Sequence, residues 1–187
     1  MSGPLPFADG AAFGRWLAMN HAAETEVLVQ MFKASSGVPS IKWEEAVIEA
    51  LAWGWIDGVK RTLDAVSWVQ RFTPRRARSV WSQRNRDHVE RLIAAGRMQG
   101  PGLAQVVAAQ ADGRWDAAYA GAAFEVPEDF LQALAGASQV AQAHYAGLNR
   151  KNLFAIYYRL TTAKRPETRA TRVAEFLAMM ERGARFY

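Results

Sequence analysis

The sequence concentrates tryptophan and arginine side chains between residues 53 and 86, where together they could bind an anion. Four of its seven tryptophans fall in this segment: Trp53, Trp55, Trp68 and Trp81. Residues 55–86 carry eight basic and two acidic side chains, a balance of +6, whereas the whole chain carries +5. A solvated charged surface is the ordinary explanation for such a run. The functional explanation is an electropositive site that binds an anion.

Asp57 is the acidic side chain in this segment whose position suggests a role. It precedes Gly58 in an expected strand and shares a face with Trp55, so we expect it to be at least partly covered. A covered carboxylate needs a cationic partner, and Arg71 on the paired strand is the natural one. The first interpretation is that Asp57 and Arg71 form an ion pair that stabilises the sheet. The alternative is that Asp57 orients an arginine that holds an anionic ligand.

Two further arginine positions complete the predicted site. Arg75 lies just before a helix start expected near Ser79, where free backbone N–H groups and the helix dipole favour anions. Arg169 borders the apolar face of the last expected helix, which suits the edge of a cleft or snorkelling at the core margin. Trp53 and Trp68 are assigned to the core. The predicted ligand-binding residues are Trp55, Asp57, Arg71, Arg75, Ser79, Trp81, Asn85 and Arg169.

Several other kinds of site are not indicated by the sequence. The three histidines, His21, His88 and His144, lie far apart and lack metal-binding spacing, and there is no cysteine. No phosphate-binding glycine loop and no nucleophile elbow is present. We therefore expect no metal and no cofactor.

Two alternatives to a simple anion-binding protein stay open. The first is an enzyme acting on an anionic small molecule, with Asp57 or Glu45 as the acid or base. The second is a nucleic-acid-binding protein, which the pI of about 9.8 permits. No nucleic-acid-binding module is recognisable, so nucleic acid is the weaker partner.

The spacing of apolar residues predicts an α+β fold that is mostly helical, with a small antiparallel sheet of about three strands. The strands are expected at 26–33, 55–61 and 67–73. Helices are expected from Asp9 to Asn20, from Trp43 through Gly54, from Ser79 or Ser82 to Gly96, and at 101–111, 127–135, 137–146, 149–163 and 166–182. No linker divides the chain, so we expect one domain over residues 1–187, with a flexible start at 1–8.

The first ten residues and the hydropathy of the chain indicate its compartment. Residues 1–10 lack the basic and apolar regions of a signal peptide, and no apolar stretch is long enough to span a bilayer. We expect a cytoplasmic protein that does not insert into membranes. The sequence leaves its oligomeric state open.

Several uncommon blocks are similar to a known family. W-E-E-A-V-I-E-A-L-A-W-G-W-I-D-G (43–58), R-F-T-P-R (71–75), S-V-W-S-Q-R-N (79–85), D-G-R-W-D-A-A-Y (112–119) and A-K-R-P-E-T-R (163–169) resemble the YdeI/OmpD-associated, bacteriocin-protection family. The resemblance implies a small bacterial protein, mostly helical with a short sheet, acting in tolerance to bacteriocins or cationic antimicrobial peptides. It implies no reaction, cofactor or catalytic residue.

This chain departs from the family pattern at two positions. Ala52 stands where relatives often carry cysteine, so no thiol chemistry is expected here. Lys42 stands where many relatives carry a capping threonine, so the helix start at Trp43 is expected to be weakly capped. The resemblance and the charge pattern together predict a non-enzymatic stress or resistance protein that binds a small anionic ligand.

Overall fold

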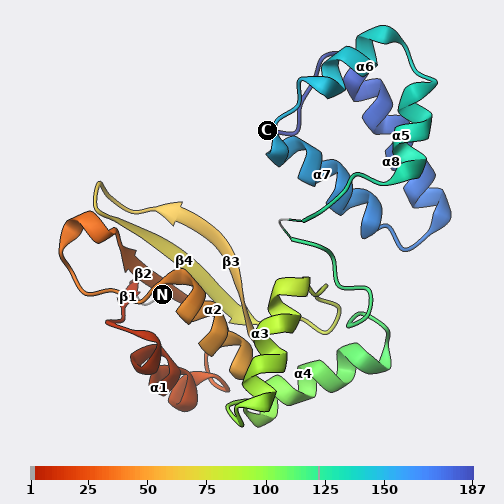
Figure 1. The fold of residues 1–187 in the computed structure, drawn as a ribbon. Helices are drawn as coiled ribbons and strands as arrows, with labels where there is room; N and C mark the ends of the chain where they lie inside the picture. The colour runs from red at the N-terminus through yellow and green to blue at the C-terminus, as the bar shows by residue number, and fades with distance from the viewer. Residues whose placement is uncertain (1–2, 122) are drawn as a thin grey trace. The chain divides into compact units, whose positions relative to one another are not determined.

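The computed structural model describes residues 3–121 and 123–187, which form two compact units (Figure 1). The first unit spans Met1–Ala118 and contains the sheet, and the second, Tyr119–Tyr187, is built from helices. The predicted α+β fold class is confirmed. One domain over residues 1–187 stays a prediction, which a single cooperative unfolding transition would support.

The sheet has four strands, one more than predicted, in the order β1-β2-β4-β3. The three predicted strands are confirmed as β2 (Val27–Phe32), β3 (Trp55–Thr62) and β4 (Ser67–Pro74), paired antiparallel. The fourth, β1 (Leu5–Pro6), pairs parallel with β2 and comes from the segment expected to be flexible. That prediction also covers residues 1–2, which lie outside the described residues.

One face of the sheet packs on the first two helices, α1 (Gly10–Asn20) and α2 (Trp43–Ala52), to form the core of the first unit. Two more helices complete this unit, α3 (Gln83–Ala94) and α4 (Gly100–Ala111), and a short 3-10 turn, η1 (Ala34–Ser36), follows β2. Val29 and Phe72 on the sheet and Phe13 and Leu51 on the helices are all buried in one cluster. This packing fixes the starts of β3 and α3, where the charged residues gather.

Side-chain caps set the helix starts of the first unit. Asp9 Oδ1 accepts a hydrogen bond from the Ala12 amide at 2.8 Å, as predicted for the first helix. Glu45 Oε2 accepts from the Lys42 amide at 3.1 Å, so the start of α2 keeps one half of a capping box. Lysine has no acceptor to make the other half. The capping is therefore weak, as predicted, only because the side-chain bond from position 42 is absent. The bond from the Lys42 amide to Glu45 is present.

The second unit packs four helices around its own core: α5 (Glu128–Ala135), α6 (Gln139–Ala146), α7 (Arg150–Thr161) and α8 (Pro166–Glu181). Phe130, Ile156, Phe176 and Met180 lie at its centre. All four helices agree with the predicted ranges to within two residues at each end. No helix in the described part of the chain is both long and apolar enough to cross a membrane.

Candidate functional site

Asp57 and Arg71 do not form the predicted ion pair, because they lie on opposite faces of the sheet. Asp57 lies opposite Phe72 in the ladder, and directly opposed residues share a face. Arg71 is the next residue along and therefore points to the other face. Its Nε donates to Glu26 Oε2 at 2.7 Å. The sequence predicted the correct strands, and a register difference of one residue changes the partner.

Asp57 instead interacts with side chains from α2, from α3 and from the loop that follows β4. Burial raises the pKa of the Asp57 carboxyl, and a hydrogen bond from the Trp43 side chain and the positive charges of Arg75 and Arg84 partly oppose that rise. Trp43 begins α2 and Arg84 lies in the first turn of α3. Sequence reasoning missed these two residues because only the fold brings them to the start of β3.

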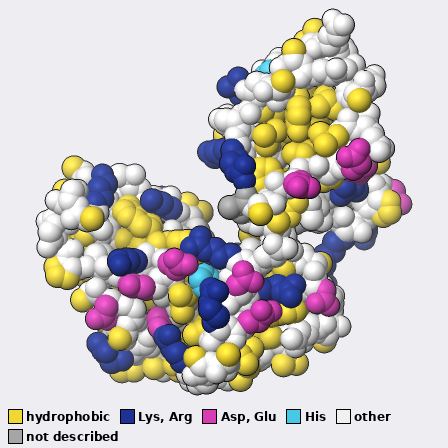
Figure 2. All heavy atoms as spheres, in the orientation of Figure 1, with side chains coloured by type: hydrophobic (Ala, Val, Ile, Leu, Met, Phe, Trp, Pro, Cys, Tyr) yellow, Lys and Arg dark blue, Asp and Glu magenta, His cyan; other side chains and the backbone are white. Residues whose placement is uncertain are grey.

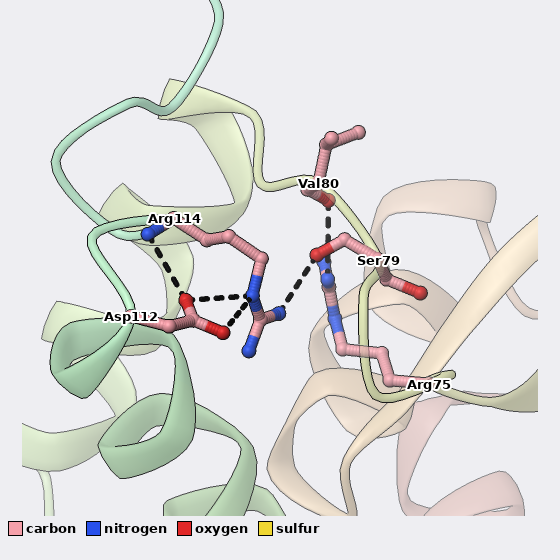
Figure 3. A network of polar contacts seen from close by, with 5 residues as sticks. All are labelled: Arg75, Ser79, Val80, Asp112 and Arg114. Carbon is pink, nitrogen blue, oxygen red and sulfur yellow. Dashed lines mark hydrogen bonds and ion pairs between the residues drawn. The ribbon is translucent and has the colours of Figure 1, made fainter. Parts of the chain in front are cut away.

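Arg75, the central residue of the predicted anion site, is buried and stabilises the fold. Its guanidinium carbon lies 3.6 Å from the ring centroid of Trp81, and its Nη1 donates to the Val80 carbonyl at 3.2 Å (Figure 3). Trp81 and Trp55 are 2% and 1% exposed, so neither forms a wall that a ligand can reach. Their burial does not favour the predicted role in lining a pocket, which stays a prediction. Their size places them in the core.

Ser79 is not at a helix start. Its hydroxyl accepts from the Arg76 amide, and its carbonyl accepts from Nη1 of the buried Arg114 at 2.9 Å (Figure 3). Arg114 in turn binds Asp112 through Nε. The helix begins after Ser82, the second of the two predicted caps, whose Oγ accepts from the amide of Asn85 at 3.2 Å. Ser79, the other predicted cap, therefore stabilises the loop before α3.

Arg169 lies in the second unit, where it has partners of its own. Its Nε and Nη2 donate to the two carboxylate oxygens of Asp129 at 2.6 and 2.8 Å, and its Nη1 donates to the Leu160 carbonyl at 2.7 Å. This pairing holds the pKa of Asp129 below its ordinary value. The arrangement joins the starts of α5 and α8 to the end of α7. We therefore interpret Arg169 as a structural residue.

A network of charged side chains connects α2 to α3. Arg84 Nη2 lies 3.0 Å from Glu44 Oε1, and His88 Nε2 lies 3.4 Å from the same oxygen. Arg91 Nη2 lies 2.8 Å from His88 Nδ1. Burial of His88 and the nearby charge of Arg91 lower the pKa of the imidazole. The network therefore contains a buried histidine between Glu44 and Arg91, and its lowered pKa favours the neutral ring.

This network borders a hollow of about 250 Å³ on the surface of the first unit. The residues lining it are Ile48, His88, Arg91, Leu92, Ala95 and Arg97. Arg97 is paired with Glu49 of α2. Figure 2 shows basic and acidic side chains alternating around a histidine on this unit. Ile48, Leu92 and Ala95 make part of the wall apolar, so the hollow, called here the α2–α3 hollow, combines cationic groups with an apolar surface.

A signal for this hollow was present in the sequence. Arg84, His88 and Arg91 follow one another at i, i+4 and i+7, which places them on one face of a helix. The basic segment 55–86 ends just before His88 and Arg91. No group of three or more metal-ligating side chains occurs within residues 3–121 and 123–187.

The fold and this hollow define an α+β protein with a sheet-containing unit, a helical unit and a charged site on the first. Residues 5–105 match the family model described as Domain of unknown function (DUF8412), and the chain belongs to that family. Residues 123–183 match the family Bacteriocin-protection, YdeI or OmpD-Associated, which confirms the resemblance for this part. No curated protein and no solved structure matches the chain.

The two matches cover four of the five blocks that suggested the resemblance, and block 112–119 lies in neither. Block 163–169 lies inside the bacteriocin-protection match, whereas blocks 43–58, 71–75 and 79–85 lie inside the match of unknown function. The α2–α3 hollow therefore belongs to the part of the chain for which neither family description states a role.

Proposed function

We propose that this chain is a non-enzymatic protein that binds a small anion with an apolar body in the α2–α3 hollow. One observation carries the proposal: Arg91, Arg97 and the protonatable His88 line the same hollow as Ile48 and Leu92. The site predicted around Arg75 thereby moves to the adjoining face of α3. The ligand class, a small anion, is the one expected from the charge of the segment.

The charges and the size of the hollow favour this class of ligand. Two arginines, Arg91 and Arg97, line the hollow, and Glu49 compensates the charge of Arg97. The charge of Arg84, in the network beside the hollow, is compensated by Glu44. Guanidinium groups bind carboxylate, sulfonate and phosphate well because their donors match paired oxygens. A hollow of about 250 Å³ suits a compact ligand, since sites for larger molecules are roughly 300–1,000 Å³.

Calorimetric titration with benzenesulfonate tests the proposal. This probe has a permanently charged head and an apolar ring, and benzenesulfonamide is its neutral counterpart. We expect benzenesulfonate to bind, benzenesulfonamide to bind at least tenfold more weakly, and Arg91→Gln to weaken binding of the anion about tenfold. Arg78→Gln, which removes one charge from an exposed position in the same unit, is the control. Equal affinities for Arg91→Gln and wild type would refute the site.

An enzyme is the second candidate, and one observation favours it. Burial raises the pKa of Asp57 and two arginines lie near it, as in many acid or base catalysts that act on anions. Glu45, the other predicted acid or base, instead accepts the Lys42 amide at the start of α2. Incubation with carboxylate and phosphate esters, followed by product analysis, would test catalysis. Turnover that persists in Asp57→Asn would dismiss Asp57 as the catalytic group.

Nucleic-acid binding is not our proposal, because much of the local positive charge is engaged inside the fold. Five of the eight basic side chains in 55–86 have internal partners. These are Lys60 with Trp68, Arg71 with Glu26, Arg75 with Trp81, Arg84 with Glu44 and Arg86 with the Trp115 carbonyl. Nucleic-acid affinity depends on arginines and lysines that can neutralise phosphates. A salt-dependent shift in a filter-binding assay would reverse this judgement.

We propose further that protection against bacteriocins, the role in the description of the matched family, acts indirectly from the cytoplasm. A site built to bind anions repels cationic peptides, so direct capture is disfavoured. Expression of the chain in a sensitive bacterium should raise survival during bacteriocin exposure, and Arg91→Gln should remove the gain. Equal protection by wild type and Arg91→Gln would show that the resistance role does not depend on the hollow.

A further inference from the structure

We infer that an anion entering the α2–α3 hollow is bound together with a proton taken up at Nδ1 of His88, so that the site binds more tightly at lower pH. The inference rests on the proposed function and adds its regulation. It follows from the hydrogen bonds of one buried imidazole, whose residue is 3% exposed and lines the hollow.

The protonation state of His88 in the empty site follows from its neighbours. Arginine has donors only, so the 2.8 Å contact with Arg91 Nη2 requires Nδ1 of His88 to accept. The proton of the neutral ring therefore sits on Nε2, which lies 3.4 Å from the Glu44 carboxylate. Nδ1 is thus the nitrogen that can gain a proton, and it lies on the side of Arg91.

Protonation without an anion is unfavourable in this geometry. A proton on Nδ1 would place two donors, and two positive charges, 2.8 Å apart. An oxyanion that replaces this direct contact, with Arg91 turned away from Nδ1, accepts a hydrogen bond from each group and compensates both charges. Proton uptake and anion binding therefore stabilise each other, as linkage requires.

The other charged groups around His88 act in both directions. On α3, Arg84 opposes protonation as Arg91 does, and Asp87 favours it. On α2, Glu44 favours protonation. After α3, Arg97 lines the same hollow and is paired with Glu49. Burial and the arginines outweigh the carboxylates, so the pKa of His88 is lowered in the empty site.

The sign of the pH dependence follows. An anion raises the pKa of His88 from its lowered value, so the affinity increases as the pH falls through the pKa of the bound state. It stops increasing below the pKa of the empty state, where His88 is protonated before binding. One proton changes the affinity by up to about tenfold per pH unit within that window.

The experiment measures benzenesulfonate affinity from pH 5 to pH 8, a range in which the probe itself does not titrate. We expect wild type to bind threefold to tenfold more tightly per pH unit in the window. His88→Gln has an amide oxygen that can accept from Arg91 but takes up no proton, so its affinity should not change with pH. His21→Gln is the control for a histidine elsewhere in the same unit and should keep the wild-type slope.

Each outcome separates the two proposals. Absence of benzenesulfonate binding at every pH would overturn the proposed function. Binding with the same affinity from pH 5 to pH 8, or a wild-type slope in His88→Gln, would overturn only the proton linkage. An NMR titration of the His88 ring in wild type gives the same answer without a variant, because its pKa must rise when benzenesulfonate is added. An unchanged pKa would overturn the linkage.

Discussion

Arg75 lies over the indole of Trp81, with its guanidinium carbon 3.6 Å from the ring centroid, and both side chains are buried. The arginine that the sequence placed at the centre of an anion site therefore contacts the core. An arginine in this position gains from the ring face and from the Val80 carbonyl that accepts its Nη1. Its first role is to fix the loop between β4 and α3.

Replacing Arg75 should therefore destabilise the first unit. Arg75→Met keeps much of the apolar stem and removes the contact with Trp81 and the hydrogen bond, so we expect a loss of about 2 kcal/mol. Urea unfolding followed by tryptophan fluorescence measures it. Arg76→Met, at the exposed neighbouring position, should stay within about 0.5 kcal/mol of wild type. A loss at Arg75 no larger than at Arg76 would contradict the structural role.

Asp57 should make stability fall as the pH rises. Its pKa in the folded state is raised by burial, so its contribution to stability is fully present below the pKa of the unfolded state and is lost as the pH rises through the folded pKa. Asp57→Asn removes the ionisation and keeps an oxygen for Trp43. The variant should be more stable than wild type at pH 7, with a smaller difference at pH 4. A variant less stable than wild type at pH 7 would show that the carboxylate is favourably paired.

The sheet shows what sequence spacing can and cannot predict. Alternation of apolar residues located β2, β3 and β4 to within a residue at each end, because one face of each strand is buried. β1 was missed because two residues, one of them Pro6, are too short to show a period. The Asp57–Arg71 pair failed because spacing gives faces within a strand, whereas partners depend on the register between strands.

The site shows the same limit at longer range. Charge counting led to Arg75 and Ser79, but charge alone does not distinguish an exposed arginine from one buried against Trp81. The stripe of Arg84, His88 and Arg91 could be read from helical spacing. Its partner Glu44 and the wall residue Ile48 come from α2, and only the packing of α2 on α3 shows them.

Gly102 should be intolerant of a side chain because α4 lies close to the end of α2. A Cβ added at Gly102 would lie 2.3 Å from the Ala52 carbonyl oxygen, a backbone atom that cannot move alone. Gly102→Ala should cost about 1–3 kcal/mol, as overpacking does. Gly100→Ala, in the same helix, meets nothing within 4 Å and should be neutral or stabilising. Thermal unfolding of the pair measures the difference, and equal melting temperatures would refute the close approach.

Asn152 should hold the C-terminal segment to the second unit. Its side chain is fully buried, and Oδ1 accepts from the amides of Phe186 and Tyr187 at 2.8 and 3.3 Å. Asn152→Ala leaves both amides without this acceptor, so we expect a loss of about 2 kcal/mol and faster hydrogen exchange at Phe186. Glu175→Ala, an exposed change on α8, should alter neither quantity. Protection of the Phe186 amide that survives in Asn152→Ala would show that other contacts, such as its ring against Phe176, hold the segment.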